Sequence, residues 1–213
     1  MDNGSQGSAW EPLIARKLAE LTDPGRLAFI ASLADRLAPS YEAFATEVGL
    51  LGGRFVARMV EMLFKVALNE GSAPEELSAT RSVLLSSLDD ARGRSLVILE
   101  SGARYAVRVA DYGLAYIERA DAALAVEAAS TACAAAYAYV RLVTVPLTAG
   151  RDDAARDAWL EAAPLVIEER ERQLGDVDAL VGGFDARTIE RMRAANRRAG
   201  IQPFERGLYH RPP

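Results

Sequence analysis

The chain is poor in the side chains that most enzymes use as bases and nucleophiles, with one histidine and one cysteine among 213 residues. The histidine, His210, lies within the last four residues, between Tyr209 and Arg211. A chain terminus is a poor place for a preorganised base, so we expect His210 to be a solvated side chain. Ser-His-Asp and Cys-His catalysis, zinc sites built from histidine and cysteine, and helical di-iron sites are therefore not expected.

The single cysteine, Cys133, stands in the apolar run of residues 132–136. A thiol in such surroundings keeps a high pKa and stays inert, so we interpret Cys133 as a core residue. One cysteine cannot form an internal disulfide, which suits the reducing cytoplasm, and we expect the protein to be cytoplasmic. No residue pattern indicates a metal or any other cofactor, and none is expected.

Phosphate loops and membrane segments are also missing from the sequence. The glycine pairs at residues 52–53 and 182–183 lack the spacing of nucleotide-binding loops, and we interpret them as helix boundaries. The polar, acidic start at residues 1–5 does not resemble a signal peptide. The longest uncharged stretch, residues 128–140, is shorter than the roughly 20 residues that cross a bilayer, so no membrane partner is expected.

Half of the residues are hydrophobic and 26% are charged, a balance typical of globular proteins. The apolar residues recur at helical spacing, and the one β-rich run, residues 142–145, has no partner run. We therefore predict an all-α fold, a single-domain bundle of about eight or nine helices with no sheet. Residues 1–9 are expected to be flexible, residues 10–199 to form the helical domain, and residues 200–213 to be a docked C-terminal tail.

Proline, glycine and capping residues predict where the helices begin and end. Asp23 is predicted to cap a helix that ends at Pro39, after which Ser40 would cap the next one. Pro164 is expected to kink or split the helix that starts near Asp152. The other predicted helices start near Trp10 or span residues 54–69, 74–89, 95–119, 121 to just before Pro146, and 185–199.

Three groups of charged residues could carry chemistry or form surfaces. Asp153, Asp157 and Glu161 share one helix face and could hold a hard cation, but we interpret them as a solvated acidic face. The charged run of residues 168–172 is likewise predicted to be wet surface. The third group is predicted to form an intramolecular ion-pair face, with a seam against a partner or substrate as the alternative; it consists of Glu100, Arg104, Arg108 and Asp111.

The C-terminal region differs from the rest of the chain in charge. From Asp185 onward there are seven arginines against three acidic residues, whereas the whole chain has a net charge of −5. This asymmetry indicates either an anionic partner or docking of the basic end on the acidic body, and we favour docking. The acidic net charge argues against a nucleic-acid partner. The candidate partner-binding residues are Arg193, Arg197, Arg198 and Arg206.

The segment of residues 33–44, LADRLAPSYEAF, resembles a known bacterial family. The pattern acid–Arg–apolar–x–Pro–x–Tyr–x–x–Phe, followed by a Val-Gly turn at residues 48–49, is similar to domain-of-unknown-function family 416, the YjaG-like proteins. The likeness extends from about Leu18 to Ala199. Ser40 stands where the family has asparagine, and Tyr105 stands near a position where the family often has aspartate.

This resemblance implies an all-helical fold with no established activity and no catalytic residues to transfer. We interpret its motif residues as structural rather than as a ligand site: the proline ends a helix, two aromatic residues plug the corner, and the arginine pairs with a carboxylate. These residues are Arg36, Pro39, Tyr41 and Phe44.

The exclusions and the charge asymmetry together favour a non-enzymatic protein-binding protein, of the immunity or adaptor type, that acts through a helical surface. One alternative is a small-molecule binder or carboxylate-based enzyme, which would need a deep pocket with convergent acids or arginines. Another is a structural homodimer built on the Ala-rich helix or the C-terminal helix.

Overall fold

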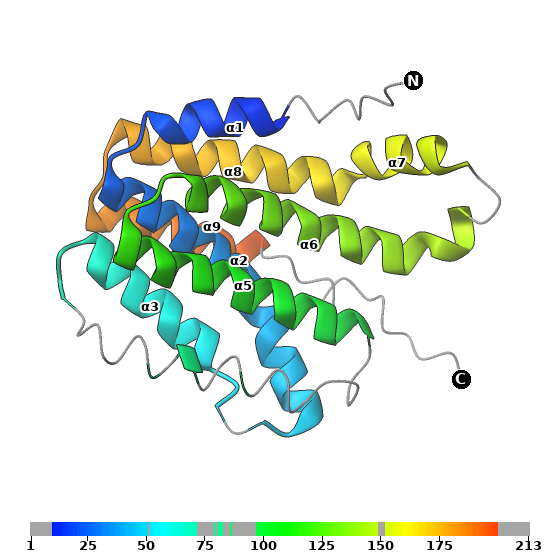
Figure 1. Cartoon of the computed structure of the whole chain (residues 1–213), viewed down its shortest axis with the longest axis horizontal. Helices are drawn as coiled ribbons and strands as arrows, with labels where there is room; N and C mark the ends of the chain where they lie inside the picture. Colours follow the sequence, from blue (N-terminus) through cyan, green and yellow to red (C-terminus); the bar gives the residue numbers. More distant parts are fainter. Residues whose placement is uncertain are drawn as a thin grey trace.

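The computed structural model describes residues 10–50, 52–71, 79, 81–82, 86, 97–148 and 152–199, of which 97–98, 143–148, 153 and 198–199 are described by their backbone alone. This part of the chain is an all-α bundle without β-strands, as predicted (Figure 1). The predicted flexible residues 1–9, the C-terminal residues 200–213 and most of the helix predicted at 74–89 lie outside the described residues. The helices are α1 (Trp10–Ala19), α2 (Asp23–Val48), α3 (Phe55–Ala67), α5 (Val97–Arg119), α6 (Ala123–Thr148), α7 (Asp153–Glu161), α8 (Pro164–Gly182) and α9 (Ala186–Ala199).

Helix α2 is the central element of the bundle and contacts α3, α5, α6, α8 and α9. It begins at the N-cap Thr22, whose Oγ1 accepts a hydrogen bond from the backbone N–H of Gly25 at 3.3 Å, so Thr22 rather than Asp23 is the cap. The helix ends at Gly49, which has a φ of 68°, a left-handed conformation that glycine adopts without strain. Because α2 is buried on most of its circumference, it organises the packing of its neighbours.

The predicted helix break at Pro39 is wrong, because α2 continues through Pro39 to Val48 and Ser40 lies buried inside it. A proline inside a helix removes one backbone hydrogen bond and costs about 3 kcal/mol. Apolar burial on both sides of Pro39 offsets this cost, since each fully buried aliphatic or aromatic side chain contributes about 1.5–3 kcal/mol. In Figure 1, α2 bends in its light-blue second half, as a proline inside a helix predicts.

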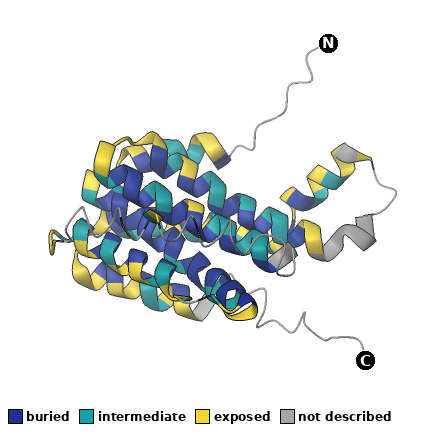
Figure 2. Ribbon diagram, turned by 60° about the horizontal axis from the view of Figure 1, so that its bottom comes forward, coloured by how far each residue is buried: buried dark blue, intermediate teal, exposed yellow. Residues whose placement is uncertain are grey.

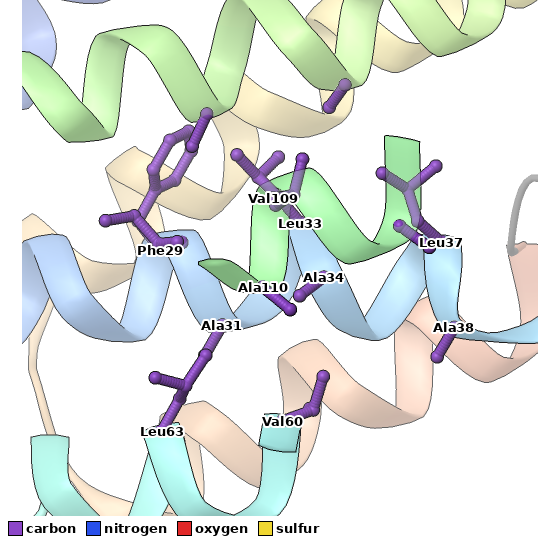
Figure 3. Packing of buried hydrophobic residues seen from close by; sticks show 14 of the residues in the cluster. Phe29, Ala31, Leu33, Ala34, Leu37, Ala38, Val60, Leu63, Val109 and Ala110 are labelled. Carbon is purple, nitrogen blue, oxygen red and sulfur yellow. The ribbon is translucent and has the colours of Figure 1, made fainter. Parts of the chain in front are cut away.

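The main hydrophobic core lies where α2 meets α3 and α5. Figure 3 shows Phe29, Leu33 and Leu37 of α2 packed among side chains of its neighbours, with Leu63 of α3 and Val109 of α5 completing the cluster. Figure 2 shows the buried positions concentrated on the inner faces of the helices and the exposed positions on their outer faces. Amphipathic burial of this kind, rather than intrinsic helix propensity, stabilises a helical bundle.

Two glycines of α5 permit close helix packing. A Cβ atom at Gly113 would lie 2.6 Å from Leu63 Cδ1 of α3, and one at Gly102 would lie 3.0 Å from Ser40 Cβ of α2. Helix α5 can therefore approach α2 and α3 at these positions only because it lacks a side chain there.

Helix α6 is the Ala-rich helix predicted to end before Pro146, but it extends to Thr148. Residues Ala123–Leu142 are long and apolar enough, by length and composition, to cross a membrane. Half of this stretch is buried inside the structure, as in the core helix of a soluble protein, so the criterion carries little weight. The second half of α6 forms a second, smaller core with α7 and the start of α8; its buried residues are Ala136, Val140, Leu160, Ala163 and Val166.

Candidate binding site

A fully buried arginine joins α2 to α8. Arg36 has a relative exposure of only 2%, and its guanidinium forms salt bridges with two carboxylates of α8. Arg36 Nη1 lies 2.6 Å from Asp176 Oδ2, and Arg36 Nη2 lies 3.1 Å from Glu169 Oε1. The expectation that Arg36 pairs with a carboxylate is confirmed by both of these partners.

Polar side chains of α2, α8 and α9 extend this arrangement into a network, which we call the Arg36 cluster (Ser32, Arg36, Glu169, Gln173, Asp176 and Asn196). Ser32 Oγ donates to Asp176 Oδ2 at 2.8 Å, and Asn196 Nδ2 donates to Ser32 Oγ at 3.0 Å. Gln173 Nε2 donates to Glu169 Oε1 at 2.9 Å. The cluster thus connects α8 and α9 to the central helix α2.

The charges of this cluster stabilise one another. Burial opposes a charged guanidinium, but Glu169 and Asp176 outweigh it and raise the pKa of Arg36. Burial also raises the pKa of the neighbouring Asp35, and this effect outweighs the hydrogen bond from Asn196, which lowers the pKa. Three buried polar atoms, Arg36 Nε, Glu169 Oε2 and Gln173 Oε1, have no hydrogen-bond partner in the described part of the chain.

The prediction that the charged run of residues 168–172 is wet surface is wrong for Glu169, which has a relative exposure of 1%. The spacing of α8 explains the error. Val166, Glu169, Gln173, Val177 and Leu180 are all buried and recur at three- and four-residue intervals along one helix face. Glu169 and Gln173 are polar residues at core positions of this apolar stripe, so the sequence itself indicated that they needed buried hydrogen-bond partners.

Helices α8 and α9 run antiparallel (Figure 1), and an open groove with a volume of about 710 Å³ lies between them. Arg36, Asp176 and Asn196 of the Arg36 cluster border it. The rest of its lining combines charged rims with small residues, namely Arg172, Gly175, Asp178, Ala179, Gly182, Gly183, Asp185, Thr188, Arg191, Met192 and Ala195. This volume falls in the range of small-molecule sites, about 300–1,000 Å³.

Most charged groups of this groove already have partners. Asp178 pairs with Lys17 of α1 at 2.7 Å, and Arg172 lies 3.5 Å from Glu168. Asp185 caps α9 by accepting the backbone N–H of Thr188 at 2.7 Å, and this hydrogen bond lowers the pKa of the Asp185 carboxyl. Arg191 donates one hydrogen bond, to Thr188 Oγ1 at 3.0 Å, and forms no salt bridge with a described residue.

The arginines predicted to bind a partner do not share one environment. Arg197 is exposed on α9, together with Arg187 and Arg191. Arg193 is half-buried, and its guanidinium lies 5.4 Å from the ring centre of Phe64 in α3, so it helps to pack α9 on the bundle. Of the other two candidates, Arg206 and the side chain of Arg198 lie outside the described residues.

The motif residues of the family resemblance all lie in α2. Tyr41 and Phe44 are completely buried in the main core. Because the helix continues through Pro39, the two aromatic rings pack along one helix instead of plugging a corner between two.

The mixed-charge stripe of α5 is largely paired within the chain. Glu100 and Arg104 form a salt bridge of 2.7 Å, and Arg108 Nε donates to Tyr112 Oη at 3.0 Å. Asp111 pairs with Arg81. The prediction of an intramolecular ion-pair face is therefore confirmed for Glu100, Arg104 and Asp111, whereas Arg108 hydrogen-bonds to a tyrosine.

The acidic face predicted at the start of α7 is exposed at both residues whose side chains are described. Asp157 is exposed, and the side chain of Asp153 lies outside the described residues. Glu161 has a side-chain exposure of 45%, forms a salt bridge of 2.7 Å with Arg170 and accepts a hydrogen bond from Tyr137. Burial alone would raise the pKa of the Glu161 carboxyl, but the hydrogen bonds from Arg170 and Tyr137 outweigh it and lower this pKa. Among the described residues, no group of three or more histidine, cysteine or acidic side chains is placed to hold a metal ion.

The thiol of Cys133 is expected to be unreactive in the folded protein. Cys133 is 4% exposed, and burial, followed by the charge of Glu169, raises its pKa to about 12. At pH 8 the thiolate fraction is therefore about 1 in 10,000. Iodoacetamide at pH 8 is expected to leave the native protein unmodified and to alkylate it fully in urea, as read by mass spectrometry. Native labelling at the rate of a free cysteine would contradict the burial of this residue.

The fold and the site define a class of protein, an all-α bundle with a buried arginine–carboxylate network beneath an open groove. The sequence matches no family model, and no curated protein matches it. Among solved structures, the fold is similar to that of a DUF416 family protein from Shewanella baltica OS155, with a TM-score of 0.76 and 16% sequence identity. The match covers 89% of this chain and 95% of that chain. The resemblance to family 416 predicted from the sequence is thus confirmed in the fold.

Proposed function

We propose that this chain is a non-enzymatic, cytoplasmic binding protein of the adaptor or immunity type, which recognises an acidic surface on another protein. The single observation that carries the proposal is the set of exposed arginines on α9. Arg187, Arg191 and Arg197 are exposed and form no salt bridge with any described carboxylate. Arginine is enriched at protein interfaces because its planar guanidinium can bind a carboxylate with two hydrogen bonds.

The other polar faces of the bundle make less suitable interfaces. The stripe of α5 and the Glu161–Arg170 pair already use their charges within the chain. A partner that bound there would have to compete with existing ion pairs, whereas the arginines of α9 form no salt bridge with a described carboxylate and interact with Asp185 and Asp35 only at longer range.

A homodimer through the same face is less well supported than a complex with a different protein. A two-fold symmetric contact places a surface patch against its own copy, so the arginines of one α9 would face those of the other. Like charges brought together in this way oppose association. The charge of α9 therefore favours an acidic partner over a second copy of this chain.

The proposal is tested by affinity capture of the tagged protein from its own cells, with mass spectrometry of the proteins that co-purify. The double variant Arg187→Glu, Arg197→Glu is expected to weaken capture of the specific partner by tenfold or more, and added salt is expected to weaken wild-type binding. Arg16→Glu is the matched control, because Arg16 is also exposed but lies on α1. The proposal fails if no specific partner is captured, or if the double variant and the control bind it equally well.

A further inference from the structure

The groove between α8 and α9 presents two complementary groups with unused hydrogen-bonding capacity, the Oδ1 atom of Asp176 and the guanidinium of Arg191. We infer that this groove binds a short zwitterionic peptide or peptide-like molecule, with its ammonium group on Asp176 and its carboxylate on Arg191. This inference goes beyond the proposed protein–protein function, because it assigns a small ligand to the interior of the groove rather than a partner to the outer face of α9.

The acidic half of the site is the free oxygen of Asp176. Its Oδ2 atom accepts hydrogen bonds from both Ser32 and Arg36, at 2.8 and 2.6 Å. Its Oδ1 atom accepts none from the described residues, and the side chain is 12% exposed at the border of the groove. The two bonds to Oδ2 hold the carboxylate in one orientation, so Oδ1 is a preorganised acceptor for an ammonium group.

The basic half of the site is Arg191, on the facing side of the groove. Only one of its N–H groups is engaged, by Thr188, so the guanidinium can still bind a carboxylate. The other arginine of the rim, Arg172, is already paired with Glu168. The site therefore has one acceptor oxygen without a described hydrogen-bond donor and one cation without a described salt bridge, which matches a ligand that carries one charge of each sign.

The floor of the groove is formed by the edge of the Arg36 cluster. Arg36 is almost completely buried, borders the groove and has an Nε–H without a hydrogen-bond partner in the described part of the chain. This Nε atom has almost no accessible surface, so a molecule in the groove cannot reach it, and the unpaired donor is a cost of the Arg36 cluster itself. Asn196 also borders the groove, so its floor is polar.

Glycine in the middle of α8 keeps this space open. Gly175 lines the groove, and a Cβ atom there would meet no atom within 4 Å. Its backbone does not require glycine either, because its φ lies outside the left-handed region. A glycine inside a helix lowers stability by about 0.5–1 kcal/mol relative to alanine, and neither packing nor backbone geometry accounts for it here. Gly175 is exposed, so a larger side chain at this position would extend into the open groove.

The size and lining of the groove favour a ligand of di- to tetrapeptide size. The groove is open to solvent, and its volume of about 710 Å³ has room for a ligand of this size. Met192, Ala179 and Ala195 add apolar lining between the charged groups, which suits a ligand with an apolar side chain between its two termini.

Calorimetric titration of the full-length protein with alanylleucine tests the inference. The free dipeptide is expected to bind, whereas its N-acetylated form and its C-terminal amide each bind at least tenfold more weakly. Gly175→Leu is expected to weaken binding of the free dipeptide tenfold or more by filling the groove, and to remain folded because its side chain enters open space. Arg119→Gln, at an exposed position of α5 outside the groove lining, is the control and is expected to bind as the wild type does.

Three outcomes would overturn the inference. The first is no heat of binding for alanylleucine at millimolar concentration. The second is equal binding of the free and blocked dipeptides, which would remove the roles of Asp176 and Arg191. The third is unchanged binding by a folded Gly175→Leu variant, which would place the ligand elsewhere. None of these results depends on capture of a protein partner, so this site and the proposed function can fail separately.

Discussion

Replacement of Arg36 by methionine is expected to lower the free energy of unfolding by about 3–5 kcal/mol. The substitution leaves Glu169 and Asp176 without their cation, in a site where Glu169 has almost no access to water. The loss of one partner from a buried ion pair is costly because the remaining charge is neither paired nor hydrated. Urea denaturation followed by circular dichroism measures the effect.

A solvent-accessible arginine provides the control for this experiment. Arg104 also forms a salt bridge, with Glu100, but its side chain is 38% exposed. Exposed pairs contribute about 0.2–1 kcal/mol, so Arg104→Met is expected to have a small effect. If Arg36→Met is as stable as Arg104→Met, the Arg36 cluster does not stabilise the fold in the way described here.

Replacement of Phe44 by alanine is expected to cost about 3–5 kcal/mol of unfolding free energy, because its ring is completely buried in the main core. For a chain of this length, each kcal/mol corresponds to about 2–4 °C in the melting temperature. Differential scanning calorimetry can therefore resolve the change easily.

The matched control is Ile167→Ala, because Ile167 is a large apolar residue that is 41% exposed. Exposed substitutions of this kind change stability by about 0.5 kcal/mol or less. Equal melting temperatures for the Phe44 and Ile167 variants would show that Phe44 is not a core residue, and would reopen the interpretation of the family motif as a ligand site.

Helical periodicity predicted the class of fold and most helix positions, because amphipathic spacing is a local property of the sequence. The helices α1, α3, α5 and α9 lie within two residues of their predicted starts. Pro39 and Pro146 were the exceptions, since local rules end a helix at proline whereas the structure continues through both positions. Around Pro39 the reason is tertiary: burial on both sides of the proline outweighs the lost hydrogen bond.

The candidate site was predicted only in part. The sequence identified Arg36 and the arginines of α9, but it could not identify Asp176 and Asn196 as the partners of Arg36. These residues are 140 and 160 positions away in the sequence, and only the packing of α8 and α9 on α2 brings them together. Glu169 could have been found from the apolar stripe of α8, in which it occupies a core position. The groove itself depends on the spacing between two helices, which no local pattern encodes.

Amide hydrogen exchange of the wild type and the Arg36→Met variant tests most directly the claim that the Arg36 cluster holds α8 and α9 on the central helix. Under conditions in which the variant stays folded, the amides of α8 and α9 are expected to lose far more protection than those of α5 and α6. Protection of α8 and α9 at the wild-type level, or an equal loss along all helices, would contradict this claim.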